Sequence, residues 1–533
     1  MRKPCFQRLF LYFLIITDLS EIRKRSFLKL FRQMRINYYI RGGIIFKAMK
    51  DRIIGREREK VVLTSLYQSN NAEFLAVYGR RRVGKTYLVR EFFEDMFAFY
   101  HTALSPFELK DQPKLLYRAQ LDEFAHSLKK YGETNDAPIE NWFEAFHRLE
   151  SLLDGKKGRK RMVVFIDEMP WLDTPRAGFM SAFEHFWNGW GAGKHNLLLI
   201  VCGSATTWML DKLIHNTGGL YGRTTRELHL RPFSLHQTEK YCKSMGLTMD
   251  RYDILQSYMI LGGVPYYWSY FQKGKSLAEN VDDLFFSSGG KLTDEFENLF
   301  TSLFGDRVKY RMVVEALSKS RYGMTREQIA VKVKMASGGD LSEILKSLEK
   351  SDLISSYYNF GETKRNRYFK LTDPFCLFYL NFVQKHPTRN KSYWQDNQFT
   401  PKVNTWRGLA FEDVCFVHQE EIRSALGIRG VQAEVYPWRT GGEGKTGGAQ
   451  IDMLIDRADR VMNVCEIKFS RSEFEIDKNY EADLRRKVDA VLENVKSRRT
   501  PIMTLITTYG LKYNMYSGRI QKVVVMDDLF REE

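Results

Sequence analysis

A glycine-rich loop lies between an apolar run and a helical pattern near the front of the chain. It follows the apolar residues 74–78 and consists of Gly79, Arg80, Arg81, Arg82, Val83, Gly84, Lys85 and Thr86. Glycines let backbone N–H groups curl around phosphate oxygens, and the start of the following helix adds its positive end. Lys85 can reach the β- and γ-phosphates, and Thr86 can offer its hydroxyl to Mg²⁺. The GxxxxGK[ST] spacing, placed between strand and helix, therefore predicts an ATP site.

Two carboxylates follow a second apolar run, which covers residues 162–166. At the tip of such a strand, Asp167 can hold Mg²⁺ through water, and Glu168 can polarise the attacking water as a general base. A third apolar run, residues 196–202, leads to Ser204. A polar residue there would lie beside the γ-phosphate, and a serine that only forms a turn is the alternative. The sequence therefore predicts hydrolysis of ATP as well as binding.

A third group of charged residues lies near the C-terminus. Side chains alternate between the two faces of a strand, so Glu466 and Lys468 lie on one face of the expected strand 461–468. Asp452 begins the strand before it. Two carboxylates on adjacent strands can share a hard divalent cation, and the lysine can orient or deprotonate an attacking water. Glu412, in a helical pattern, would complete the ligand set. These residues predict metal-dependent cleavage of phosphodiesters, with merely solvated strand charges as the alternative.

The elements that hold these residues must belong to several domains, because 533 residues exceed the size of a single core. Hydrophobic residues make up 44% of the chain and charged residues 28%, as in soluble globular proteins. The six cysteines are widely separated, which argues against a zinc site or a disulfide framework and suits a reducing compartment. We therefore expect a cytoplasmic protein that does not contact a membrane.

Positive charge is concentrated in the first 48 residues. The net charge is +17, and residues 1–48 hold eleven basic and two acidic side chains, so 11 − 2 = +9 lies there and 17 − 9 = +8 in the rest. That remainder permits DNA binding without requiring it. The apolar run Leu9–Ile16 is far shorter than the ~20 residues that span a bilayer. We expect residues 1–48 to be upstream sequence from a misassigned start, with Met49 as the true first residue and a membrane anchor as the alternative.

The middle of the chain, residues 306–400, shows three helical patterns followed by an alternating hairpin, the order of a winged helix-turn-helix. The expected wing carries four basic residues, Lys364, Arg365, Arg367 and Lys370. Such a wing can contact DNA phosphates, which gives affinity without sequence specificity. The third helix, however, carries acidic residues, namely Asp340, Glu343, Glu349 and Asp352. Packing of this domain against the rest of the chain is therefore favoured slightly over the reading of DNA sequence.

The motifs around the predicted ATP site together resemble a known family. These motifs are FLAVYGRRRVGKTYLV, VVFIDE, LIVCGSATTWM, LYGRTTREL, LGGVPYY and LTDPFCLFYLNFV. They are similar to the archaeal-type ATPases of the AAA+/STAND group, over about residues 53–533. The resemblance implies that residues 54–57 lie near the adenine and that residues 262–265 belong to a helical lid. It also implies that Arg223 senses charge or reaches a neighbouring subunit, so self-association through the ATPase domain is expected; a surface arginine on a turn is the alternative.

The C-terminal pattern resembles the PD-(D/E)xK nuclease fold. Glu412, Asp452, Glu466 and Lys468 stand in that family's positions, and Ile451 stands where the family has proline. The proline position is not a metal ligand. The resemblance therefore implies a metal-dependent nuclease domain at this end of the chain.

Together, these patterns predict an α/β protein in four parts: a P-loop ATPase core with a parallel sheet (49–235), a helical lid (236–305), a winged helix and connector (306–400), and an α/β restriction-endonuclease-like domain (401–533). ATP and Mg²⁺ are the expected cofactors, and DNA is the expected partner, with ATP hydrolysis gating the nuclease. The alternative is a regulatory ATP switch that binds DNA or a protein partner without cleavage. The sequence does not indicate whether the DNA is single- or double-stranded, or whether ATP activates or restrains the nuclease.

Overall fold

The computed structural model describes residues 52–532, except for 107, 108, 110, 157, 159, 160, 217, 305, 306, 362–365, 387–389, 441–448 and 495–498. The expected leader and start, residues 1–49, and the basic wing residues Lys364 and Arg365 lie outside this range. Within it, no helix combines the length and apolar character needed to cross a membrane. The cysteines of this range are free and buried: Cys202, Cys242, Cys376, Cys415 and Cys465.

The front of the chain forms a five-stranded sheet in the order β2-β3-β4-β1-β5. All its pairs are parallel, and its strands are β1 (Glu73–Tyr78), β2 (Phe97–Thr102), β3 (Met162–Asp167), β4 (Leu197–Gly203) and β5 (Arg226–His229). Every residue of β3 and β4 is buried, because helices cover both faces of a parallel sheet. The helices are α4 (Glu57–Gln68), α5 (Lys85–Phe93), α6 (Pro113–Lys130), α7 (Trp142–Asp154), α8 (Phe179–Gly189) and the short α9 (Thr206–Trp208). The predicted parallel sheet is thus confirmed.

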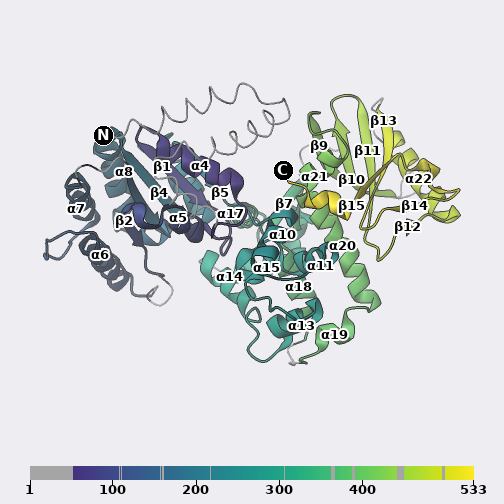
Figure 1. Cartoon of the computed structure of the whole chain (residues 1–533), viewed down its shortest axis with the longest axis horizontal. Coiled ribbons are helices and arrows are strands. Elements are labelled where there is room, and N and C mark those ends of the chain that lie inside the picture. Colours follow the sequence, from purple (N-terminus) through teal and green to yellow (C-terminus); the bar gives the residue numbers. More distant parts are fainter. Residues whose placement is uncertain are drawn as a thin grey trace, which may run out of the picture.

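A helical region follows, between this sheet and a second five-stranded sheet formed by the C-terminal part (Figure 1). Its first helices are α10 (Leu235–Ser244), α11 (Arg251–Leu261), α12 (Pro265–Trp268), α13 (Leu277–Val281) and α14 (Glu295–Leu303). Next come α15 (Arg307–Leu317), β6 (Met324–Thr325), α16 (Arg326–Val333), α17 (Gly339–Lys350), β7 (Ile354–Tyr358) and β8 (Arg367–Leu371), with the small antiparallel sheet β6-β8-β7. The helices α18 (Pro374–Phe378) and α19 (Tyr393–Asn397) connect this middle segment to the C-terminal part.

Helix α17, the third helix of the middle segment, packs against the domain that contains the parallel sheet. Lys346 and Lys350 pair with Asp211 at 2.9 and 3.0 Å. On the following hairpin, Arg367 pairs with Glu349 at 2.9 Å, and Lys370 pairs with Asp413. These four basic side chains therefore pair with carboxylates of the chain itself.

The C-terminal part begins with α20 (Pro401–Val417) and α21 (Gln419–Ala425) and forms a second five-stranded sheet in the order β15-β13-β11-β10-β9. The elements are β9 (Ala433–Thr440), β10 (Ala449–Arg457), β11 (Val461–Lys468), α22 (Lys478–Asn494), β13 (Thr500–Thr507) and β15 (Lys522–Val525), with the small pair β12 (Phe474–Glu475) and β14 (Leu511–Lys512). One apolar core runs from α10 and α11 through the middle segment to one face of this sheet, where it includes Met453, Ile455, Cys465 and Ile467.

Strand β10 contains an irregularity at the predicted acidic residue. The pairing of β10 with β9 shifts register between Ile451 and Leu454. These two residues lie three positions apart, yet both pack in the same apolar cluster on the α22 side of the sheet. A regular strand would place them on opposite faces, so the bulge resets the alternation at Asp452 and Met453. Asp452 thus lies inside β10, three residues after its start, and does not begin the strand as the sequence suggested.

Gly263, between α11 and α12, lies directly against the backbone of Phe233, which precedes α10. A Cβ atom at this position would lie 1.9 Å from the carbonyl oxygen of Phe233, whose N–H donates to the Gly263 carbonyl at 2.6 Å. We predict that Gly263→Ala lowers the unfolding free energy by about 1–3 kcal/mol, the usual cost of overpacking. Thermal unfolding followed by circular dichroism would measure it as a lower midpoint.

The matched control is Gly408→Ala in α20, where nothing lies within 4 Å of the added Cβ. Alanine is favoured over glycine inside a helix by about 1 kcal/mol, so this variant should unfold at the same or a higher temperature. Equal midpoints for both variants would contradict the packing argument.

Candidate functional site

The glycine-rich loop connects β1 to α5 and curls around its own lysine. Gly79 and Gly84 adopt positive φ angles of 135° and 93°, which L side chains rarely adopt. The Lys85 ammonium donates to the carbonyl oxygens of Gly79 and Arg80 at 2.9 and 3.0 Å. The lysine is buried at the start of α5, where the helix N-terminus also favours anions. The loop therefore gathers the donors that a phosphate needs around one position.

Thr86 and Asp167 lie side by side, as the sequence predicted. The Thr86 hydroxyl donates to Asp167 Oδ1 at 3.1 Å. Burial, and then the negative charge of Glu168, raise the pKa of Asp167 to about 6. A cation at this place would offset both effects, and a hydroxyl with a carboxylate is an oxygen donor set that suits Mg²⁺. These two residues therefore fit the metal that accompanies ATP.

Glu168 and Ser204 meet at the carboxyl ends of the adjacent strands β3 and β4. Glu168 Oε2 accepts the backbone N–H of Ser204 at 3.0 Å and its hydroxyl at 2.9 Å. Glu168 also adopts a left-handed backbone conformation, with φ at 49°, which is uncommon for a residue with a side chain. The strained backbone and both hydrogen bonds fix where the carboxylate points. Ser204 thus holds the predicted general base.

Two arginines of the loop, Arg80 and Arg82, pair with carboxylates outside it. Arg80 is 1% exposed, pairs with Asp373 and donates to the Tyr267 hydroxyl at 3.4 Å, while Arg82 pairs with Glu295. Asp373 also accepts the N–H of Cys376 and so caps α18. Neither of these two carboxylate partners was predicted from the sequence. The Asp-Pro step at 373–374 indicates the start of a helix, but no local pattern predicts that Asp373 pairs with a distant arginine.

The remaining predicted arginines lie apart from these contacts. Arg81 is half-buried. Burial raises the pKa of Glu295, and the charge of Arg82, the hydrogen bond of Tyr267 and, more weakly, the charge of Arg81 oppose this rise without reversing it. Arg223 is exposed on a turn that its N–H closes with the Leu220 carbonyl at 3.0 Å. Among the described residues, no ion pair joins the Arg223 side chain to the loop. The structure does not bring it together with Lys85.

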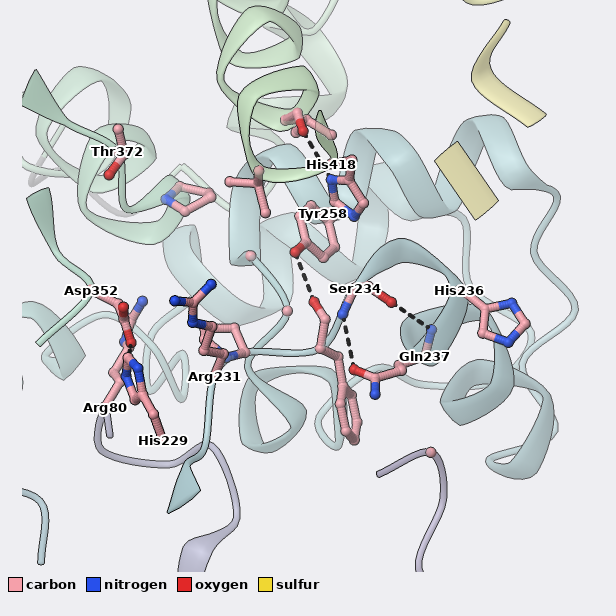
Figure 2. Close-up of a pocket in the computed structure, with 18 of the residues that line it drawn as sticks. Arg80, His229, Arg231, Ser234, His236, Gln237, Tyr258, Asp352, Thr372 and His418 are labelled. Atoms are coloured by element: carbon pink, nitrogen blue, oxygen red, sulfur yellow. Dashed lines mark hydrogen bonds and ion pairs between the residues drawn. The ribbon is translucent and has the colours of Figure 1, made fainter. Parts of the chain in front are cut away.

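A cavity of about 810 Å³ lies beside the loop, between the sheet domain, the helical region and α20. Arg56 lines it, donates to the Val83 carbonyl at 3.1 Å and lies over the Phe233 ring at 4.5 Å. Figure 2 shows Arg80, His229 and Asp352 on one side and Tyr258 with His418 on another. Ligand sites have volumes of about 300–1,000 Å³, so the cavity can hold a nucleoside. Residues 55–57, predicted near the adenine, line it.

His418 is a neutral part of this cavity wall. Its Nε2 accepts the N–H of Leu235 at 2.9 Å, and its Nδ1 lies 2.9 Å from the Val414 carbonyl. Burial lowers the pKa of His418 to about 4. The imidazole therefore joins α10 to α20 as an uncharged hydrogen-bonding group.

In the C-terminal part, the predicted Asp452, Glu466 and Lys468 line one pocket of about 490 Å³. Lys468 Nζ lies 2.7 Å from Glu466 Oε1 and 3.9 Å from Asp452 Oδ2. Asp452 also accepts the N–H of Ile467 at 2.9 Å. Burial, and then the charge of Glu466, raise the pKa of Asp452. The negative charges of two close carboxylates repel each other, and a divalent cation bound between them would offset both this repulsion and the cost of burial.

Two further side chains hold Glu466, and neither was predicted for this role. Lys487 of α22 lies 2.9 Å from both Glu466 oxygens, and the Tyr480 hydroxyl donates to Oε1 at 2.9 Å. Burial acts to raise the pKa of Glu466, but the charges and hydrogen bonds of Lys468 and Lys487 outweigh it and hold that pKa below its usual value. The helical spacing of Tyr480 and Lys487, seven residues apart, could have indicated one shared face.

Glu412 lies next to this pocket but has another partner. Arg321 Nη2 lies 3.0 Å from Glu412 Oε1. Burial, and then the charge of Asp452, raise the pKa of Glu412 to about 7. Glu412 is not among the residues that line the pocket. Among the described residues, no three His, Cys, Asp or Glu side chains lie close enough together to hold a metal ion, so the three carboxylates do not form a ready cluster.

Residues 54–271 match the family described as an ATPase domain predominantly from Archaea. An uncharacterised protein of Methanocaldococcus jannaschii is 25% identical over 381 residues, which cover 68% of this chain and 76% of that protein. Among solved structures, a Walker-type ATPase of Pyrococcus abyssi has 21% identity and a TM-score of 0.43, covering 62% of this chain and 96% of the other. Cdc6p of Pyrobaculum aerophilum has 13% identity and a TM-score of 0.28, covering 62% and 93%. This family match supports ATPase activity for residues 54–271.

Proposed function

We propose that this chain couples ATP hydrolysis in residues 54–271 to Mg²⁺-dependent cleavage of DNA in residues 401–533. The observation that carries the second half is the single pocket lined by Asp452, Glu466 and Lys468, with the additional cations Arg439 and Arg486 on its wall. DNA is a polyanion that buried carboxylates repel, so cationic side chains are needed for it to approach them. We further propose the winged-helix fold for residues 306–400 and the PD-(D/E)xK fold for residues 401–533.

In the ATPase site, Lys85 would hold the β- and γ-phosphates, and Thr86 and Asp167 would hold Mg²⁺. Mg²⁺ bound there supplies charge stabilisation for phosphoryl transfer. Glu168, positioned by Ser204, takes a proton from the attacking water. The remaining loop residues supply backbone N–H groups. Arg223 is exposed, so it is available to a neighbouring subunit in a self-associated form.

In the nuclease site, Asp452 and Glu466 would hold the divalent cation, with Glu412 as a third ligand. That cation would polarise the phosphodiester and a water. Lys468 orients the water, and Lys487 with Tyr480 fixes the Glu466 carboxylate. Arg439 and Arg486 contact flanking phosphates. Each role follows from a side chain that lines the pocket or touches one that does.

A regulatory ATP switch that binds DNA or a protein without cleavage is the second candidate. One observation favours it: Glu412, Asp452 and Glu466 all lie near cationic side chains of the chain itself, namely Arg321, Lys468 and Lys487. A pocket whose carboxylates are already neutralised could serve binding alone. The two candidates differ in whether Lys468 is needed for any bond cleavage.

We predict that Glu168→Gln retains ATP binding but lowers the rate of ATP hydrolysis at least ~10²-fold, because a neutral amide cannot take a proton. Phosphate release and binding of a fluorescent ATP analogue measure the two effects separately. Glu123→Gln, an exposed position on α6, is the matched control and should hydrolyse ATP normally. Unchanged hydrolysis in Glu168→Gln would remove this residue from the mechanism.

We predict that the wild type nicks supercoiled plasmid or single-stranded DNA with Mg²⁺ or Mn²⁺, and that Lys468→Ala lowers cleavage at least ~10²-fold while ATP hydrolysis stays intact. The control is Lys512→Ala, an exposed lysine that pairs with Glu475 at 2.9 Å on the neighbouring small strands. Lys85→Ala shows whether cleavage needs ATP. ATP hydrolysis without cleavage by any form would favour the regulatory switch.

A further inference from the structure

The turn between α15 and β6 lies over the candidate nuclease pocket. Its Arg321 and Tyr322 line the pocket together with residues of β9, β10, β11 and α22. The Tyr322 hydroxyl bonds to the Gln450 side chain, and the Arg439 guanidinium lies 5.0 Å from the centre of the Tyr322 ring. The middle segment therefore supplies one wall of a site whose carboxylates belong to the C-terminal part.

Arg321 forms an ion pair with Glu412, the carboxylate that would act as the third metal ligand. Its guanidinium lies 3.0 Å from Glu412, whose side chain is only 14% exposed, while Arg321 itself is 41% exposed. A guanidinium on a carboxylate neutralises the charge that would attract a cation. For Glu412 to bind a divalent ion, Arg321 has to leave, and its exposure lets it move without disturbing the core.

The same turn contacts β8, the strand whose C-terminal end leads toward the ATP site. β6 pairs with β8 directly after the turn, and a Cβ at Gly323 would lie 2.4 Å from the Phe369 carbonyl oxygen. Lys370 of β8 pairs with Asp413, the neighbour of Glu412. Asp373, two residues beyond the strand, pairs with the loop residue Arg80. A single short segment thus contacts the phosphate loop, the helix that carries Glu412 and the turn that carries Arg321.

From these contacts we infer that Arg321 is an autoinhibitory latch on the nuclease site and that ATP binding releases it through Asp373 and β8. Phosphate groups in the loop compete with Asp373 for Arg80, β8 shifts, and Arg321 withdraws from Glu412. The inference rests on the proposed nuclease function and specifies how it is regulated: the arrangement described above is the restrained state, and ATP activates cleavage.

Arg321→Ala tests the latch directly. We predict that cleavage without ATP rises roughly fivefold, the size of effect that a partly exposed ion pair can contribute, and that ATP adds little further. Arg321→Lys keeps the charge and should stay restrained. Arg326→Ala is the matched control, since this arginine of the same segment is 44% exposed and pairs with Glu327. Unchanged or lower cleavage in Arg321→Ala, with Lys468→Ala still inactive, would overturn the latch and leave the nuclease standing.

Mn²⁺ binding, measured by electron paramagnetic resonance without nucleotide, gives a readout that does not depend on cleavage. We expect roughly fivefold tighter binding in Arg321→Ala, and loss of that gain when Glu412→Gln is added. Tighter binding without cleavage by any form would support the latch and refute the nuclease. Equal Mn²⁺ binding in wild type and Arg321→Ala would refute the latch.

The link to ATP is tested by Asp373→Asn. Asparagine also caps helices, so α18 should keep its start while the charge that holds Arg80 is removed. We expect ATP hydrolysis to continue, cleavage without ATP to rise and its response to ATP to fall below twofold, about the level of no coupling. A full ATP response in Asp373→Asn would show that Asp373 does not carry the signal.

Discussion

Among the described residues, Arg80 is one of the largest fully buried side chains, and the equally buried Asp373 neutralises it. Removing one partner of a buried ion pair costs about 3–5 kcal/mol, because the other charge is left without compensation. The pair joins the loop that receives phosphates to the segment that follows β8. The position of the middle segment, and with it of Arg321 and α17, therefore depends on a contact made by the phosphate loop itself.

A continuous apolar core reinforces this dependence. It extends from α10 and α11 through the middle segment to the β10 and β11 face that carries Met453 and Cys465. Because these parts share one core, large separations between them would expose apolar surface, and small shifts of strands and side chains cost much less. Changes that pass through these parts to the C-terminal pocket are therefore best served by local rearrangements, in which a few ion pairs exchange partners.

The local chemistry of the ATP site could be predicted from the sequence, because it depends on short-range order. Lys85 and Thr86 follow a strand directly, and Asp167, Glu168 and Ser204 come at the ends of apolar runs, so parallel strands bring them to one edge. The family match supports an ATPase in residues 54–271, while the roles of these individual residues stay predictions. The C-terminal nuclease stays a prediction, although period two placed Glu466 and Lys468 correctly on one face of β11.

The contacts that could not be predicted join residues far apart in the chain. Lys487 reaches Glu466 only because α22 packs on that face of the sheet, and Arg321 meets Glu412 only because the middle segment docks there. No periodicity in a single segment contains this information. Asp373 illustrates the same limit, since its sequence context predicts a helix cap and its buried ion pair comes from tertiary packing.

The bulge in β10 has a consequence for how this region can vary. Ile451 and Leu454 share a face although they are three residues apart, so the separation between them determines where Asp452 points relative to Glu466. Deleting one residue there would restore regular alternation while leaving the composition of both strands almost unchanged. The acid would then rotate away from its partner. A substitution in this stretch replaces one side chain at a time, whereas a change in its length would separate the acidic pair without altering either acid.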